Sequence, residues 1–281
     1  MAEEIKASLK DEVLELGKSA GRRIRLAVAQ VRSDTVTEKF LAEKKKFGSA
    51  VGIDLRIYNI EESISTNQLR KKLAEIVHIK ENTGVIVQLP LPKQINTQYI
   101  LDGIISEKDP DMLSSKSIGL FSTGRSKILP PVVGAIKLIL EKNSIELCGR
   151  RATVLGAGRL VGKPVATWLI NEGAAVTVID EHTTDPTLHT INADILISGI
   201  GAPNLIKPSM VKDGVVAIDC GTSVAGDEIV SRHEMRSRLI GDIDPAVAEK
   251  AALFTPVPGG VGPLTVAMLF KNLMELAKAK P

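Results

Sequence analysis

A glycine-rich segment near the middle of the chain has the residue types of a phosphate-binding loop. It runs from Gly156 to Gly162 as Gly-Ala-Gly-Arg-Leu-Val-Gly and directly follows the apolar run Ala152–Leu155. Between a strand and a helix, such glycines let the backbone approach a pyrophosphate, and the helix N-terminus supplies N–H donors. The pattern is one residue longer than the commonest dinucleotide fingerprint. We predict that a dinucleotide contacts Gly156, Ala157, Gly158, Arg159 and Gly162.

An acidic residue stands where a dinucleotide site needs one. Asp180 ends the next apolar run, 24 residues after Gly156, and a carboxylate at about this spacing accepts hydrogen bonds from the adenosine ribose. Glu181 follows it directly. Two neighbouring carboxylates would repel the 2′-phosphate of NADP+, so the sequence favours NAD+. The alternative is a tight turn in an α/β domain that binds no nucleotide.

The second half of the chain is built from repeated strand–helix units. After the glycine loop come the apolar runs Ala175–Asp180, Ala193–Ile200 and Val215–Asp219, with helical segments before the first two. Repeated βα units with continuous apolar strands imply a parallel sheet that is covered on both faces. We predict an α/β fold with a Rossmann domain over residues 131–254.

The first half also alternates strands and helices. Strands are predicted at Arg23–Val31, Leu55–Ile60 and Gly84–Val87. A helix is predicted from a capping box at Thr35 and Glu38 towards Phe47, and another from the spacing of Leu69, Leu73, Ile76 and Val77. Gln88 therefore lies at the carboxyl end of a strand, the edge of a parallel sheet where ligands bind. Residues 109–131 are expected to be irregular, and helices are predicted at Val133–Lys142 and Leu264–Lys278.

Composition excludes several classes of function. The 281 residues carry a net charge of +3 and 3% aromatic residues, which disfavours a nucleic-acid partner. No apolar run approaches the roughly 18 residues of a membrane span, and the acidic N-terminal segment lacks the apolar core of a signal peptide. Two cysteines and four histidines lack metal-ligand spacing, so we expect no metal. A cytoplasmic enzyme without membrane or nucleic-acid partners is expected.

Three segments, in order, match one family. They are Thr37-x-x-Phe40-x-x-x-Lys44, the run Gly84–Pro92 (GVIVQLPLP), and the run Thr255–Thr265 (TPVPGGVGPLT). The chain resembles the methylenetetrahydrofolate dehydrogenase/methenyltetrahydrofolate cyclohydrolase family over nearly its whole length. The last two strings are much more specific than the glycine loop.

The resemblance implies a domain organisation, a pair of reactions and a set of partners. A folate-binding catalytic domain of residues 1–130, completed by residues 255–281, would accompany the NAD(P)-binding Rossmann domain. The implied reactions oxidise 5,10-methylenetetrahydrofolate with NAD(P)+ and hydrolyse the methenyl product to 10-formyltetrahydrofolate. NADP+ is the alternative cofactor that the family suggests. Tetrahydrofolate derivatives would be the substrates, and a homodimer the usual assembly.

The resemblance also assigns roles to single residues. Lys44 would handle the proton of the hydrolytic step, Gln88 would fix that lysine, and Asp111 would bind the pterin. Phe40, four residues before Lys44, shares its helical face and would contact substrate. Backbone close to the ligands would come from Pro258, Gly259, Gly260, Gly262 and Pro263. Further cofactor contacts would come from Gly199, Gly221 and Thr222.

Simpler interpretations exist for these residues, and the chain departs from the family at three places. Lys44 lies in a run of three lysines, which is usually a solvated face; Gln88 would then cap a sheet edge and Asp111 would be a turn residue. Phe40 replaces the family's tyrosine. Residues 111–114 read Asp-Met-Leu-Ser instead of D-G-F-H, and residues 129–134 depart from P-C-T-P-x-G. A dehydrogenase with weak or no cyclohydrolase activity, or a non-catalytic binding protein, are the alternatives.

Overall fold

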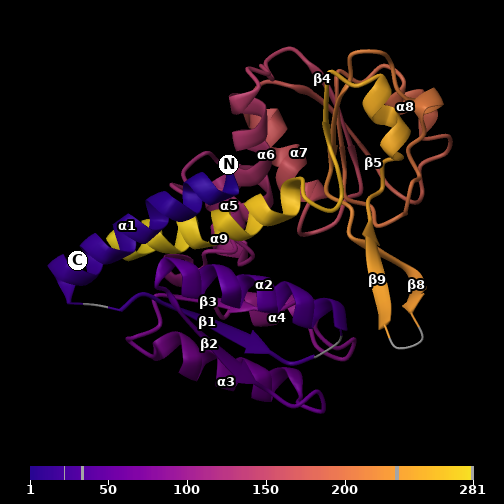
Figure 1. The fold of residues 1–281 in the computed structure, drawn as a ribbon. Helices are drawn as coiled ribbons and strands as arrows, with labels where there is room; N and C mark the ends of the chain where they lie inside the picture. The colour runs from indigo at the N-terminus through magenta and orange to yellow at the C-terminus, as the bar shows by residue number, and fades with distance from the viewer. Residues whose placement is uncertain (22, 33–34, 232–233, 280–281) are drawn as a thin grey trace. The chain divides into compact units, whose positions relative to one another are not determined.

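The chain folds into two compact units (Figure 1). A computed structural model describes residues 1–21, 23–32, 35–231 and 234–279. Unit 1 comprises Met1–Pro131 and Thr265–Pro281, and unit 2 comprises Val132–Leu264. Residues 255–264, which the sequence led us to group with the first domain, lie in unit 2 because the strand that ends at Thr255 pairs within its sheet.

Unit 1 contains a parallel three-stranded sheet in the order β2-β1-β3. Its strands are β1 (Arg25–Gln30), β2 (Asp54–Asn59) and β3 (Gly84–Val87), each within two residues of the predicted bounds. The central strand β1 pairs with both neighbours along its length. The carboxyl ends of all three strands therefore lie at one edge, where Gln88 follows β3.

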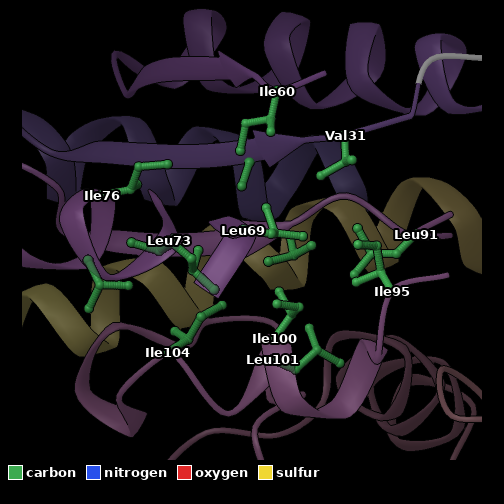
Figure 2. Close-up of a cluster of buried hydrophobic side chains, with 14 of the residues drawn as sticks. Val31, Ile60, Leu69, Leu73, Ile76, Leu91, Ile95, Ile100, Leu101 and Ile104 are labelled. Carbon is green, nitrogen blue, oxygen red and sulfur yellow. The ribbon is translucent and has the colours of Figure 1, made fainter. Parts of the chain in front are cut away.

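Helices cover both faces of this sheet, as the alternation along β1 requires. Ala27 and Ala29 of β1 belong to a cluster with buried residues of α3 (Thr66–His78) and α4 (Thr97–Leu101), shown in Figure 2. Leu26 and Val28 belong to a second cluster with residues of α1 (Ala2–Ala20), α2 (Thr35–Val51) and α9 (Val261–Lys278). The helix predicted from Thr35 begins at Thr35 itself, whose side chain lies outside the described residues.

One short helix, α5 (Ser115–Ser122), interrupts the stretch predicted to be irregular, and the 3-10 turn η1 (Ser106–Lys108) lies just before that stretch. Ser114 caps α5 by accepting the N–H of Ser117. The irregular assignment was wrong for α5, because its apolar spacing is masked by the surrounding serines. The next helix, α6 (Pro131–Lys142), begins two residues before its predicted start.

Unit 2 contains a parallel five-stranded sheet in the order β10-β7-β6-β4-β5. Its strands are β4 (Arg151–Leu155), β5 (Ala175–Ile179), β6 (Ile195–Ser198), β7 (Val216–Asp219) and β10 (Leu253–Thr255). Within this unit, α6 and α7 (Gly162–Asn171) lie on one side and α8 (Thr187–Thr190) on the other (Figure 1). The order reverses between β4 and β6, and ligands bind at such a switch point.

An antiparallel hairpin projects from this sheet and was not predicted (Figure 1). It consists of β8 (Ser223–Ser231) and β9 (Glu234–Ile240), with two register irregularities. The 3-10 turns η2 (Pro208–Met210) and η3 (Pro245–Glu249) complete the unit. Among the described residues, no helix has the length and apolar composition to cross a membrane, and no group of three or more His, Cys, Asp or Glu is arranged to hold a metal ion.

Candidate functional site

Lys44 and Gln88 meet at the carboxyl edge of the unit 1 sheet. The Lys44 Nζ donates a hydrogen bond of 2.8 Å to Gln88 Oε1, and Gln88 Nε2 donates to the Leu89 carbonyl at 3.0 Å. Gln88 is buried and Lys44 is half-buried. Burial lowers the pKa of the Lys44 ammonium, and the charge of Asp111 opposes that shift. An amine held in this way can accept or deliver a proton more readily than a solvated lysine.

The three consecutive lysines of α2 therefore have different surroundings. Lys45 and Lys46 are exposed. Lys45 lines a groove of about 480 Å³ between α2 and the ends of β1 and β2, together with Glu38 and Asn59. Lys44 is not among the residues that line this groove. The interpretation of the run as one solvated face applies to Lys45 and Lys46 and is wrong for Lys44.

Asp111 completes the cluster in unit 1. Burial raises the pKa of its carboxyl to about 6, the nearby Lys44 ammonium opposes this shift, and the charge of Asp109 adds to it. A carboxylate and an amine whose charges interact, beside an amide that fixes the amine, can both bind N–H donors and move a proton. Of the three predicted catalytic residues, Lys44 thus contacts Gln88 directly and lies close enough to Asp111 for their charges to interact.

Two buried polar residues that the sequence did not single out hold the segment around Asp111. Asp109 accepts the N–H groups of Leu113 (3.3 Å) and Ser114 (2.9 Å) and the Ser114 hydroxyl (2.7 Å). Asn272 of α9 donates to the Pro110 carbonyl at 2.9 Å and to the Leu129 carbonyl at 2.7 Å. The sequence offers one indication of the role of Asn272, because this polar residue lies between the buried Phe270 and Leu273.

The departures from the family pattern have structural consequences. Met112 has a φ of 60°, a conformation that favours glycine, at the position where the family has glycine. Its side chain is buried, and Ser114, at the family's histidine position, bonds to Asp109. Phe40 is half-buried on the helix that carries Lys44. Asp109 therefore holds this segment through Leu113 and Ser114.

The glycine loop in unit 2 has the geometry of a phosphate cradle. Gly156 has a φ of 98°, which permits the tight turn after β4. A Cβ on Gly162 would lie 1.8 Å from the Gly156 carbonyl oxygen, so the first turn of α7 packs directly on the loop. A Cβ on Gly158 would meet no atom within 4 Å, which leaves open space beside the backbone. The residues present therefore fit the pyrophosphate of a dinucleotide.

Asp180 lies at the end of β5, beside the glycine loop's strand β4. Its Oδ1 accepts the N–H of His182 at 3.0 Å and lies 3.4 Å from the Thr183 hydroxyl. Asp180 and Arg159 are half-buried, and Glu181 is exposed. The next lysine or arginine along the chain, Lys207, forms an ion pair of 2.9 Å with Asp244.

The other predicted cofactor contacts follow strands of the same sheet. Gly199 follows β6, Gly221 lies two residues after β7, and Thr222 beside it is exposed. A Cβ on Gly156 would lie 2.9 Å from the Gly199 carbonyl oxygen, so these two loops touch. Asp242 holds the segment that contains Gly199, and Asp219 accepts the N–H of Gly221. The sequence did not single these two aspartates out.

The segment Thr255–Pro263 belongs to unit 2 and leads into α9. Gly259 has a φ of 104°, and the Gly260 N–H donates to the Pro256 carbonyl at 2.8 Å. Pro258, Gly259, Gly262 and Pro263 are exposed, so their backbone is accessible to a ligand. Helix α9 begins at Val261, three residues before the predicted start, with Pro263 in its first turn.

Comparison with known proteins gives two matching family descriptions. Residues 1–111 match "Tetrahydrofolate dehydrogenase/cyclohydrolase, catalytic domain", and residues 130–281 match "Tetrahydrofolate dehydrogenase/cyclohydrolase, NAD(P)-binding domain". A bifunctional protein FolD of Wolinella succinogenes is 38% identical over 278 residues, which cover 99% of this chain and 94% of the relative.

Solved structures with the same fold include two enzymes. The bifunctional methylenetetrahydrofolate dehydrogenase/cyclohydrolase of Campylobacter jejuni has a TM-score of 0.88 at 35% identity, over 99% of this chain and 95% of that one. The corresponding Trypanosoma brucei enzyme, complexed with NADP cofactor and inhibitor, has a TM-score of 0.92 at 32% identity, over 99% and 94%.

Proposed function

The chain belongs to the tetrahydrofolate dehydrogenase/cyclohydrolase family, and from this premise we propose what each cluster of residues does. The protein is a bifunctional enzyme of one-carbon metabolism. It oxidises 5,10-methylenetetrahydrofolate with NAD(P)+ and hydrolyses the resulting methenyl compound to 10-formyltetrahydrofolate. The observation that carries our assignment of the hydrolytic centre is the 2.8 Å hydrogen bond between Lys44 and Gln88 beside Asp111.

Lys44 serves as the proton-handling residue of the hydrolytic step. Water must add to the methenyl carbon and lose a proton, and a partly desolvated amine is suited to take it. Gln88 holds the amine by accepting its hydrogen bond and is itself fixed through the Leu89 carbonyl. The charge of Asp111 keeps the Lys44 pKa from falling further.

Asp111 binds the pterin. Its two carboxylate oxygens suit the adjacent N–H donors of a planar amino-pyrimidinone edge. Asp109 and Asn272 fix the flanking backbone, which supports a rigid acceptor at this position. Phe40 contacts the substrate, and the backbone of Pro258, Gly259, Gly260, Gly262 and Pro263 forms further ligand contacts; all of these except the half-buried Gly260 are exposed. The folate-binding domain on this proposal is residues 1–130 completed by residues 265–281, since residues 255–264 belong to unit 2.

The dinucleotide binds along the carboxyl edge of the unit 2 sheet. Gly156, Ala157, Gly158, Arg159 and Gly162 hold the pyrophosphate, and Gly199, Gly221 and Thr222 contact the rest of the cofactor. When bound, the cofactor supplies the nicotinamide that accepts the hydride. The open space beside Gly158 and the α7 N-terminus support this placement.

We propose that NAD+ is preferred over NADP+. Asp180 can accept hydrogen bonds from the ribose hydroxyls of NAD+, and a 2′-phosphate at that place would meet the charges of Asp180 and Glu181. The pairing of Lys207 with Asp244 supports the preference, because that cation is engaged elsewhere. The Trypanosoma brucei structure holds NADP, so NADP+ is the competing cofactor.

We also propose that the enzyme is a cytoplasmic homodimer, on the strength of the family resemblance. Light scattering on the purified protein would test the assembly, with a mass near twice 30.1 kDa expected. A monomer mass would contradict the dimer and leave the catalytic assignments untouched.

One absorbance assay tests the proposed function. The protein is mixed with 5,10-methylenetetrahydrofolate and either dinucleotide, and the ultraviolet absorbance of the methenyl product is followed. We expect the methenyl compound to form only with a dinucleotide and then to decay enzymatically. No formation with either dinucleotide would refute the dehydrogenase, and decay at the buffer rate would refute the cyclohydrolase.

A further inference from the structure

Two buried aspartates at the carboxyl end of the unit 2 sheet make hydrogen bonds that the proposed chemistry does not use. Asp219 ends β7 and is 1% exposed, and Asp242 follows β9 and is 0% exposed. In the described part of the chain, the hydrogen bonds of these carboxylates join three separate segments. They are residues 198–202, 219–221 and 241–243.

Asp242 holds the segment after β6. Its Oδ2 accepts the Ser198 hydroxyl at 2.8 Å, the Ile200 N–H at 2.8 Å and the Gly201 N–H at 3.3 Å. Its Oδ1 accepts the Ala202 N–H at 3.0 Å. Four donors converge on one side chain, and only a carboxylate offers acceptors alone. An asparagine at this position would turn an N–H₂ group towards donors.

Asp219 in turn holds the backbone around Asp242. Its Oδ1 accepts the N–H groups of Gly221 (2.8 Å) and Asp242 (3.1 Å), and its Oδ2 accepts that of Ile243 (2.9 Å). Burial raises the pKa of the Asp219 carboxyl and the neighbouring Asp242 charge adds to this, while the three N–H groups oppose it. Asp219 therefore holds the backbone of Asp242, and the Asp242 side chain in turn holds residues 198–202.

The packing around both carboxylates leaves no room for other side chains. A Cβ on Gly221 would lie 2.3 Å from Asp242 Oδ1, and a Cβ on Gly241 would lie 2.0 Å from Asp219 Oδ2. Since β8 begins just after Gly221 and β9 ends just before Gly241, the two aspartates also close the base of the hairpin.

The segment that Asp242 holds is in contact with the glycine loop. The carbonyl oxygen of Gly199 would lie 2.9 Å from a Cβ on Gly156, and a Cβ on Gly199 would lie 2.6 Å from Val161 Cγ1. Interiors are close-packed, so a shift of residues 199–202 moves the loop that they touch. The position of the glycine loop thus depends on a carboxylate that lies beyond it in the sequence.

We infer that Asp242, fixed by Asp219, is a positioning residue for the dinucleotide site, and that its loss weakens dinucleotide binding without affecting folate chemistry. The inference rests on the proposal that Gly156–Gly162 and Gly199 contact the dinucleotide. Methenyl hydrolysis needs no dinucleotide, and its residues lie in unit 1. If Asp242 were only structural, its loss would affect both activities. Weaker dinucleotide binding with unchanged methenyl hydrolysis therefore indicates a positioning role.

The test is Asp242→Asn in the full-length protein, with Asp194→Asn as the matched control. Asp194 precedes β6, whose other end carries Ser198, and it accepts the Arg151 N–H at 2.8 Å and pairs with Lys212. Calorimetry measures the Kd for NAD+ and for NADP+, and methenyl hydrolysis is followed by absorbance. For the dinucleotide that the parent protein binds more tightly, we expect the Kd to rise about tenfold or more in Asp242→Asn. Hydrolysis, and the dinucleotide Kd of Asp194→Asn, should stay within about twofold of the parent values.

Two results would overturn the inference. One is an unchanged dinucleotide Kd in Asp242→Asn, and the other is equal weakening in Asp194→Asn, which would indicate general loosening of the sheet. If Asp242→Asn does not fold, Ser198→Ala decides, because it removes one donor to Oδ2 and should weaken binding about threefold; an unchanged Kd there also overturns the inference. A parent protein that binds neither dinucleotide refutes the proposed site itself, and the inference with it.

Discussion

The Nζ of Lys44 donates a hydrogen bond of 2.8 Å to Oε1 of Gln88, which joins the middle of α2 to the carboxyl end of β3. Lys44 and Gln88 are far apart in the sequence, and Lys44 has lysine neighbours that remain exposed. The contact distinguishes one lysine of the run from the others. The hydrogen bond also restricts the movement of the Lys44 amine, and burial lowers the pKa of the same group.

Removal of the Asp111 carboxylate should weaken folate binding. Asp111→Ala leaves the amino and ring N–H donors of the pterin unpaired, which costs about 1–3 kcal/mol for each donor, so we expect the Kd to rise roughly tenfold or more. Calorimetry with tetrahydrofolate measures the effect. The control is Glu107→Gln, which removes a nearby carboxylate paired with Lys116 in an exposed position. Equal folate affinity in Asp111→Ala and the parent protein would exclude Asp111 as the residue that binds the pterin.

Folate binding should also depend on pH through the same carboxyl group. The pKa of Asp111 is raised to about 6 by burial. The ionised form accepts the pterin donors, so affinity should be constant above this pKa and fall as pH decreases through it. Titrations from about pH 8 to about pH 5 measure the Kd in the parent and in Asp111→Ala. A dependence that is the same in both proteins would assign it to another group.

Phe40→Tyr restores the family residue beside Lys44. The added hydroxyl lies on the face of α2 that carries Lys44, four residues before it. We expect methenyl hydrolysis at the parent rate or faster, because a tyrosine hydroxyl can hydrogen-bond the amine or the substrate. Stopped-flow absorbance gives the rate. A marked loss of hydrolysis would show instead that the site is adapted to phenylalanine.

Cofactor preference should follow the charges at the end of β5. We expect kcat/KM to be about a hundredfold higher or more with NAD+ than with NADP+, because like charges at contact distance cost several kcal/mol. Asp180→Ser should narrow the difference by improving the use of NADP+. Steady-state rates with both dinucleotides provide the test. Equal values in the parent, or a preference for NADP+, contradict this role of Asp180.

The strands and the residues at their ends could be predicted from the sequence, because both depend on local patterns. Apolar runs placed β1, β3 and β4, and Gln88 and Gly156 follow from where those runs end. The roles of Asn272, Asp219 and Asp242 could not be found in this way, because their hydrogen bonds join segments distant in the sequence. The hydrogen bonds of Asp109 are local, but they lie in a stretch without a regular apolar pattern. The hairpin β8–β9 was missed for a related reason, since strand pairing is not determined by local composition alone.

The most direct test of the account is methenyl hydrolysis in Lys44→Met, with Lys46→Met as the matched control from the exposed part of the same run. Methenyltetrahydrofolate is added to each protein, the decay of its absorbance is followed, and folate binding is measured on the same samples. We expect hydrolysis at the buffer rate in Lys44→Met with folate affinity largely retained, and hydrolysis at the parent rate in Lys46→Met. Hydrolysis at the parent rate in Lys44→Met would contradict the account.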